Sequence, residues 1–196
     1  MTFRVVSFYT IGTPYEKEVT ALIASLKDLG IRNDIRGIKS LGSWDLNTKH
    51  KPVFIKEMLD THKEEAIVWL DADAVVLRYP FIFQDIDTDI AVYYMTSSPT
   101  AKRLGGHELI TASMYFANTD RTRALLDMWI TEENRQGQPE SQLIEQRALQ
   151  RVIPAWKAQH KGTLSFLPQS YCRIFDAPED HRVIVQNQAS RRFGRS

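Results

Sequence analysis

The first half of the chain alternates between short apolar runs and stretches with helical spacing. β-Branched and aromatic residues predict strands at 3–10 and 33–39, and within the apolar run AIVWLDADAVVLRY at 66–79. Apolar positions three and four residues apart predict helices at 15–29 and 52–62. This order of strand, helix, strand, helix and strand predicts an α/β fold with a mainly parallel central sheet, flanked by helices that form right-handed crossovers.

Local signals indicate where these first elements begin and end. Gly30 is the expected stop of the first helix, and Pro52 is the expected start of the second. The segment 41–51, LGSWDLNTKHK, is expected to be a loop. The first helix should place five apolar residues on one face: Val19, Leu22, Ile23, Leu26 and Leu29.

The second half continues with strands and helices and contains no linker long enough to divide the chain. Further strands are expected at 89–95 and 110–119, around a polar loop at 97–108, and further helices at 121–133 and 141–152. Short strand-like pieces at 163–172 and 181–186 close the chain. Five apolar residues are expected in the core: Met114, Phe116, Leu125, Leu126 and Trp129. The prediction is a single domain over 1–196.

Composition narrows the class of protein. The 196 residues are 43% hydrophobic and 25% charged, which is typical of a soluble globular domain. The net charge of +1 does not favour nucleic acid as a partner. One cysteine, Cys172, suits a reducing compartment, and no stretch is long and apolar enough for a signal peptide or a transmembrane segment. A cytoplasmic protein is expected.

Two aspartates, Asp71 and Asp73, interrupt the apolar run at 66–79. In open α/β sheets, ligands bind at the carboxyl edge of the strands, where this pair is expected. Two carboxylates so close together are costly there unless a cation or the donors of a ligand pair with them. The pair therefore predicts a Mg²⁺ or Mn²⁺ site that holds a phosphate-bearing substrate.

The chain resembles the small DxD-type nucleotide-diphospho-sugar transferases, which are glycosyltransferases of the GT-A fold. The resemblance covers nearly the whole chain. Besides Asp71-Ala72-Asp73 it rests on PVFIKEMLDTH before the acidic strand and on TASMYFANTDRTRALLDMW, with Asn118, Thr119 and Trp129. IEQRALQRVI, with Glu145 and Gln146, and LPQSYCRIFD also resemble family segments. The resemblance implies transfer of a sugar from a nucleotide-sugar donor, with a UDP-sugar favoured, to a glycan or another hydroxyl-bearing acceptor.

The resemblance also implies roles for individual residues. Asp73 is the expected direct metal ligand, and Asp71 is expected to meet the ribose or a metal-bound water. Three residues should lie near the base and ribose, at the end of the first strand and the start of its helix: Tyr9, Thr10 and Tyr15. Loop cations are candidates to pair with the diphosphate: Lys49, Lys51 and Arg103. Glu145 and Gln146 are the candidate catalytic residues, and His107 is a candidate for the acceptor cleft.

Two departures from the family pattern concern the site. Family members often carry Gly where this chain has Ala112, and often carry a metal-binding His near the C-terminus, where this chain offers Gln186, Asn187 or Gln188. Asn187 matches the position of that His best and can offer a carbonyl oxygen to the metal. The tail at 183–196 is expected to close over the donor, with Arg191 or Arg192 near the diphosphate.

Two other functions are compatible with the sequence. D-A-D-A-V-V also fits the nucleophile motif of haloacid-dehalogenase-like phosphatases, in which the first aspartate would be the nucleophile. That motif usually lies on the first strand, whereas here a strand-helix-strand-helix unit precedes Asp71. The second alternative is a catalytically silent module that binds a sugar nucleotide or a glycan.

Overall fold

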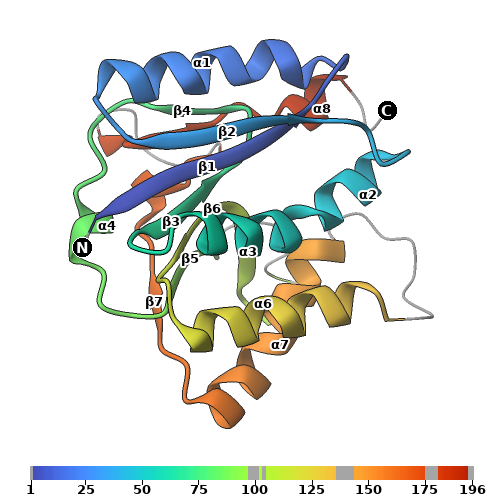
Figure 1. The fold of residues 1–196 in the computed structure, drawn as a ribbon, viewed down its shortest axis with the longest axis vertical. Helices are drawn as coiled ribbons and strands as arrows, with labels where there is room; N and C mark the ends of the chain where they lie inside the picture. Colours follow the sequence, from blue (N-terminus) through green and yellow to red (C-terminus); the bar gives the residue numbers. More distant parts are fainter. Residues whose placement is uncertain (1, 97–101, 103–104, 136–143, 175–180, 194–196) are drawn as a thin grey trace.

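The computed structural model describes residues 2–96, 102, 105–135, 144–174 and 181–193 (Figure 1). The strands are β1 (Phe3–Thr10), β2 (Asn33–Ile38), β3 (Ala66–Leu70), β4 (Ala74–Val76), β5 (Ile90–Met95), β6 (Glu108–Phe116), β7 (Leu164–Phe166) and β8 (Ile184–Gln186). The helices are α1 (Tyr15–Asp28), α2 (Trp44–Lys49), α3 (Lys51–Thr61), α4 (Ile82–Asp85), α6 (Asp120–Glu133), α7 (Ile144–His160), α8 (Ala189–Phe193) and the 3₁₀ helix η1 (Gln169–Tyr171).

The central sheet has six strands in the order β2-β1-β3-β6-β5-β7. β1 pairs in parallel with β2 and β3, and β5 pairs in parallel with β7. β6 alone in this sheet is antiparallel to both of its neighbours, β3 and β5. The mainly parallel α/β sheet predicted from the sequence is therefore confirmed.

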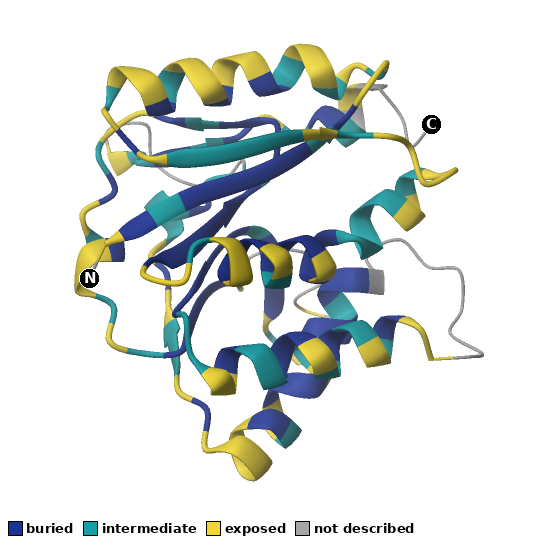
Figure 2. Ribbon diagram, in the orientation of Figure 1, coloured by how far each residue is buried: buried dark blue, intermediate teal, exposed yellow. Residues whose placement is uncertain are grey.

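Helices cover both faces of this sheet (Figure 1). α1 and the small two-stranded sheet β4–β8 lie on one face, where a first hydrophobic cluster includes Leu22, Leu26 and Ile184. α3, α6 and α7 lie on the other face, over a second cluster that includes Trp129 and Trp156. Figure 2 shows that the inner strands are mostly buried, namely β1, β3, β6 and β5, whereas the edge strands β2 and β7 are intermediate or exposed. The predicted core residues are all fully buried: Met114, Phe116, Leu125, Leu126 and Trp129.

The first helix follows its sequence signals with one exception. α1 is followed by Gly30, whose positive φ of 64° lets Ile31 N–H donate to Leu26 O at 2.9 Å and close the helix end. Val19, Leu22 and Leu26 are buried as predicted, but Ile23 is 40% exposed. The prediction for Ile23 was wrong because α1 buries a narrower stripe than expected. This stripe consists of Val19, Leu22 and Leu26, which are three and four residues apart.

The sequence pattern had suggested a loop at 41–51, and this prediction was wrong. The segment contains α2 and the first residue of α3. Ser43 caps α2, because its hydroxyl accepts a hydrogen bond from Leu46 N–H at 3.2 Å. The helix is short and buries none of its residues completely. Its apolar pattern was therefore too weak to reveal it, although the capping serine was visible.

The apolar run at 66–79 is divided between two sheets. β3 ends at Leu70, and β4 pairs in antiparallel fashion with β8 in the small sheet. Asp71 N–H continues the β3–β6 pairing by donating to Ala112 O at 3.0 Å, and the chain then turns tightly, since Ala74 N–H donates to Asp71 O at 2.9 Å. This turn carries the two aspartates.

The end of α7 also differs from the predicted helix at 141–152. Residues 141–143 lie outside the described part of the chain, and α7 ends at His160 although Pro154 lies inside it. Burial of Ile153 and Trp156 extends the helix past the proline. Among the described residues, no helix has the length and apolarity that crossing a bilayer requires.

Candidate functional site

Asp71 and Asp73 occupy the turn that follows β3, at the carboxyl edge of the central sheet. The two side chains differ in environment. The Asp71 side chain is 36% exposed, whereas residue Asp73 is only 7% exposed. The predicted place of the pair is therefore correct, and the fold makes one carboxylate accessible and buries the other.

The Asp71 carboxylate is held through one of its oxygens. Oδ1 accepts a hydrogen bond from Trp69 Nε1 at 2.9 Å and another from the Lys51 ammonium at 3.1 Å. Among the described residues, none donates a hydrogen bond to the other oxygen, Oδ2. Asp71 thus has a fixed orientation and one oxygen that remains available to a ligand.

Asp73 is bound by the C-terminal segment. Its Oδ2 accepts a hydrogen bond from Ala189 N–H at 2.6 Å, and its backbone carbonyl accepts one from Asn187 N–H at 3.2 Å. Burial, and after it the negative charge of Asp71, raise the pKa of the Asp73 carboxyl to about 6. The two aspartates therefore repel each other, and a bound cation would relieve this repulsion.

Lys51 connects this acidic turn to α7. Its ammonium is 3.1 Å from Glu145 Oε1 as well as from Asp71, and the residue is only 4% exposed. Burial by itself would lower the pKa of Lys51, but the adjacent charges of Asp71 and Glu145 outweigh burial and raise it. The sequence had suggested a loop cation, whereas Lys51 is a buried residue in the first turn of α3.

The two candidate catalytic residues are brought next to Lys51. Glu145 accepts a hydrogen bond from the Thr111 hydroxyl at 2.8 Å and another from the backbone N–H of Gln146. The Gln146 side chain donates to Glu108 at 3.2 Å. The start of α7 therefore reaches the acidic turn through a continuous network of buried polar groups.

Tyr15, one of the three residues expected near the base and ribose, is influenced by the charges of the acidic pair. Its hydroxyl accepts a hydrogen bond from Trp44 Nε1 at 3.1 Å. Burial raises the pKa of Tyr15, and the charges of Asp73 and Asp71 add to this effect. Both aspartates are therefore near this phenol.

Tyr9 and Thr10 lie at the end of β1, as expected. The Tyr9 ring packs over Gly37, where an added Cβ would lie 3.0 Å from it. Thr10 is 6% exposed, and its carbonyl accepts a hydrogen bond from the Thr13 hydroxyl at 2.7 Å. Within the described residues, no hydrogen bond joins either side chain to the acidic pair.

The C-terminal segment offers neutral oxygens beside the aspartates. Gln186 lies opposite Ala74 in the β4–β8 pair, and its amide nitrogen donates to Ala112 O at 3.0 Å and to Ser113 at 2.9 Å. The amide oxygen of Gln186 is buried and has no hydrogen-bond partner among the described residues. The next residue, Asn187, is exposed. Gln186 and Asn187 thus lie next to the acidic turn along the chain's backbone pairing, and each carries an amide oxygen.

The described residues contain no group of three or more His, Cys, Asp or Glu side chains that could hold a metal ion. A divalent cation at the acidic turn would therefore need neutral oxygens, together with those of its ligand or of water. Mg²⁺ accepts such a site, since it is commonly held by one or two carboxylates plus substrate phosphates. The residues present fit a hard divalent cation in this form.

The remaining candidates are less directly connected to the turn. Arg192 forms an ion pair with Glu18 on α1 at 2.6 Å, and Arg191 belongs to α8. His107 is exposed, with its ring centroid 6.4 Å from that of Tyr94. Lys49 is half-buried at the end of α2, and Arg103 lies outside the described residues.

Sequence reasoning missed two residues of the Lys51 network and one buried carboxyl near it. Trp69 precedes Asp71 by two residues, and side chains at this spacing in an extended chain point to the same side. The spacing could therefore have predicted the contact between Trp69 and Asp71. Thr111 is a polar residue in an apolar strand, but its partner Glu145 is distant in sequence. Glu133 is 3% exposed, and its predicted helix gave no reason to expect burial of a carboxyl.

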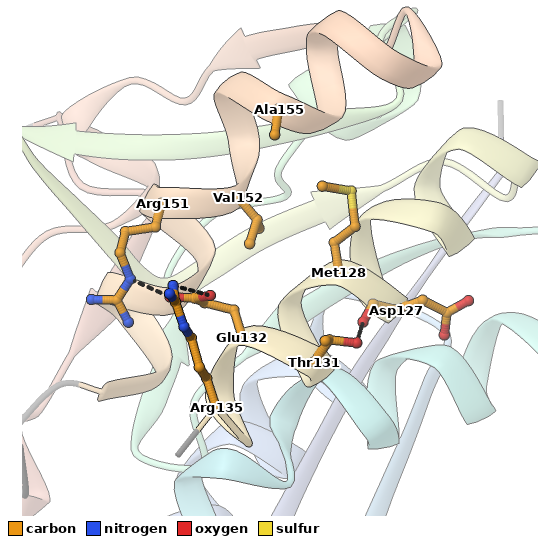
Figure 3. Close-up of a pocket in the computed structure, with 8 residues that line it drawn as sticks. All are labelled: Asp127, Met128, Thr131, Glu132, Arg135, Arg151, Val152 and Ala155. Carbon is orange, nitrogen blue, oxygen red and sulfur yellow. Dashed lines mark hydrogen bonds and ion pairs between the residues drawn. The ribbon is translucent and has the colours of Figure 1, made fainter. Parts of the chain in front are cut away.

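A separate groove of about 660 Å³ lies between α6 and α7 (Figure 3). Its polar side chains largely pair with one another, for example Arg151 with Glu132 at 2.7 Å. None of the residues of the acidic turn or of the Lys51 network lines it. The groove is therefore distinct from the candidate site.

Comparison with known proteins identifies the class of fold. No protein-family model and no curated protein matches the chain. Solved glycosyltransferase structures do match it, so the chain has the fold of glycosyltransferases.

One matching structure is a glycosyltransferase involved in the glycosylation of the major capsid of PBCV-1. It has a TM-score of 0.72 and 14% identity, over 98% of this chain and 97% of that one. Another is the glycosyltransferase GlyE of Streptococcus pneumoniae TIGR4, with a TM-score of 0.60 and 13% identity, over 95% of this chain and 54% of that one. The bifunctional WbbM in its apo form has a TM-score of 0.62 and 10% identity, over 95% of this chain and 46% of that one. This chain therefore spans about half the length of GlyE and of WbbM.

Proposed function

We propose that the chain is a metal-dependent glycosyltransferase that moves a sugar from a nucleoside-diphosphate sugar, with a UDP-sugar favoured, to a hydroxyl group of an acceptor. One observation carries the proposal. An acidic pair lies at the carboxyl edge of β3 in a chain that matches a glycosyltransferase over 98% of its length. Ligands of open α/β sheets bind at this edge.

A divalent cation, Mn²⁺ or Mg²⁺, is the proposed cofactor at this pair. When bound, it would supply Lewis-acid stabilisation of the charge that develops on the leaving diphosphate. Asp73 and the free oxygen of Asp71 are the proposed carboxylate ligands, either directly or through water. Gln186 or Asn187 is the proposed source of a neutral oxygen, because both lie beside Asp73 and the amide oxygen of Gln186 has no partner among the described residues.

The other residues of the site are assigned by position. Tyr15 lies at the start of α1 beside the aspartates and is proposed to contact the ribose or base, with Tyr9 and Thr10 at the neighbouring strand end. Glu145 and Gln146 are proposed to act on the acceptor side, since the Lys51 network links them to Asp71. The tail from 183 onward is proposed to cover the diphosphate and exclude water, which limits wasteful hydrolysis of the donor.

The test is Asp73→Asn. The amide has nearly the volume of the carboxylate but lacks its charge, so we expect an intact fold and an affinity for UDP with Mn²⁺ that is weaker by about tenfold or more, or about 1.4 kcal/mol. Isothermal titration with and without Mn²⁺ measures this affinity. Asp87→Asn, which changes an exposed aspartate near β5, is the matched control and should bind as the parent does.

Three results would contradict the proposal. The first is an Mn²⁺-dependent UDP affinity that Asp73→Asn leaves unchanged. The second is nucleotide-sugar binding with no metal-dependent release of UDP from any UDP-sugar, with or without an acceptor, which would favour a silent binding module. The third is hydrolysis of a generic aryl phosphate, which would favour a phosphatase with Asp71 as its nucleophile.

A further inference from the structure

We infer that Lys51 is a positioning residue of the donor site, which fixes the Asp71 carboxylate and is itself held by Glu145. The inference rests on the proposed function and goes beyond it, because it assigns Lys51 a role that acts through Asp71. The resemblance had instead suggested direct pairing of Lys51 with the diphosphate.

The first argument is the number of partners around the ammonium. A lysine ammonium has three hydrogens to donate. Around Lys51 they meet Asp71 Oδ1 at 3.1 Å, Glu145 Oε1 at 3.1 Å and the Thr111 carbonyl at 3.3 Å. The ammonium also lies 5.2 Å from the centroid of the Trp69 ring. Each hydrogen thus has a protein acceptor, and none is left for a phosphate oxygen.

The second argument is the effect of these contacts on Asp71. Lys51 and Trp69 both donate to Oδ1, and because a carboxylate is planar, fixing Oδ1 from two directions also fixes Oδ2. The side chain of Asp71 is 36% exposed, whereas that of Lys51 is 5% exposed. Lys51 is therefore buried behind Asp71, and by holding Oδ1 it leaves the free oxygen of Asp71, Oδ2, directed to the ligand.

The third argument is charge. Glu145 has a side chain that is 8% exposed and lies 3.1 Å from Lys51, so the pair is buried and mutually dependent. Asp71, Asp73 and Glu145 carry three negative charges and Lys51 carries one positive charge, so this group keeps two negative charges that one divalent cation balances. If Lys51 acted only through its charge, removing it together with the charge of Glu145 would leave the net charge of the site, and the binding of Mn²⁺, unchanged. If it positions Asp71, its loss weakens binding, as disruption of groups that orient metal ligands does.

The experiment is a double-mutant cycle on the full chain, with the affinity for UDP in the presence of Mn²⁺ measured by isothermal titration. Lys51→Met alone would leave Glu145 buried without its cation, so it is combined with Glu145→Gln, which removes both charges together. This pair of substitutions is made in the parent and in Asp71→Asn. Circular dichroism and thermal unfolding confirm that each variant folds.

We expect Lys51→Met with Glu145→Gln to weaken the binding of UDP with Mn²⁺ by about tenfold in the parent. The same pair should cause no further loss in Asp71→Asn, because the carboxylate on which Lys51 acts is already gone. Lys56→Met is the matched control. Lys56 lies on α3, as Lys51 does, and forms an ion pair with Asp127 on α6. Its substitution removes that ion pair and should leave the affinity for UDP with Mn²⁺ unchanged.

Equal losses in both backgrounds would overturn the inference, because Lys51 would then act without Asp71. Unchanged or tighter binding of UDP with Mn²⁺ after the paired substitution in the parent would overturn it as well. Both results leave the proposed function standing, since the parent still binds the nucleotide. Failure of the parent to bind any nucleoside diphosphate with Mn²⁺ or Mg²⁺ would instead remove the proposed function, and this inference with it.

Discussion

Glu133, the last residue of α6, is a buried carboxyl close to the Lys51 network. It is 3% exposed, and its Oε1 has no hydrogen-bond partner among the described residues. Burial, and after it the negative charge of Glu145, raise the pKa of Glu133 to about 9. At neutral pH the folded protein therefore holds a proton on Glu133 that the unfolded chain releases.

This proton predicts a pH-dependent stability. The contribution of Glu133 is fully present below its ordinary pKa of 4.5 and is lost as the pH rises to about 9. In that window the free energy of unfolding should fall by up to about 1.4 kcal/mol per pH unit. Glu133→Gln cannot ionise, so it should flatten this slope and unfold at higher urea concentration at pH 8.

Urea unfolding between pH 5 and pH 8.5 measures the slope. Glu64→Gln, at an exposed position in the turn before β3, should keep the slope of the parent. Parallel pH profiles of the parent and Glu133→Gln would show that Glu133 is not the group that binds the proton.

At the scale of elements, the junction between α7 and β7 depends on one glycine. Trp156 on α7 is fully buried, and its indole N–H donates to Arg121 O at 2.7 Å. A Cβ added at Gly162 would lie 2.1 Å from the Trp156 ring. The turn into β7 can therefore pass the tryptophan only without a side chain at this position.

Gly162→Ala should accordingly destabilise the protein. Either the indole or the turn has to move, and overpacking of this kind costs about 1–3 kcal/mol. Chemical unfolding measures the loss. Ala158→Gly changes one methyl group at an exposed position near the end of the same helix and should cost no more than about 1 kcal/mol. A cost at Gly162 no larger than at Ala158 would show that the turn adapts freely.

At the scale of the whole molecule, the C-terminal segment returns to the N-terminal half. β8 pairs with β4, Ala189 N–H donates to Asp73, and Arg192 pairs with Glu18 on α1. Figure 1 shows α8 beside one end of α1. A chain cut after Arg182 would thus lose β8 and its fully buried Ile184, so that truncation tests stability as well as closure.

A cut after Gln188 separates these two effects. It keeps β8 and removes α8, so we expect the fold to persist while UDP affinity in the presence of Mn²⁺ falls and hydrolysis of a UDP-sugar rises relative to transfer. Titration calorimetry and a UDP-release assay measure both quantities. Glu18→Gln, which removes only the ion pair with Arg192, should give the same change to a smaller degree. Binding and turnover equal to those of the full chain would make the tail a solvated end.

Local pattern in the sequence was sufficient for much of the fold. The order of strands and helices followed from apolar periodicity, and the core residues Met114, Phe116, Leu125, Leu126 and Trp129 followed from the same pattern. The position of Asp71 and Asp73 at a strand end followed from the apolar run before them. These features can be predicted from the sequence because each depends on residues that are close together in the chain.

Tertiary structure alone decided how the aspartates are surrounded. Lys51 meets Asp71 and Glu145 only after α3, β3 and α7 have packed together, and β4 becomes a strand only because β8 returns to pair with it. The same packing buries Glu133 beside Glu145. Burial and charge at these positions are set by neighbours far along the chain, and the periodicity of a single segment carries no information about them.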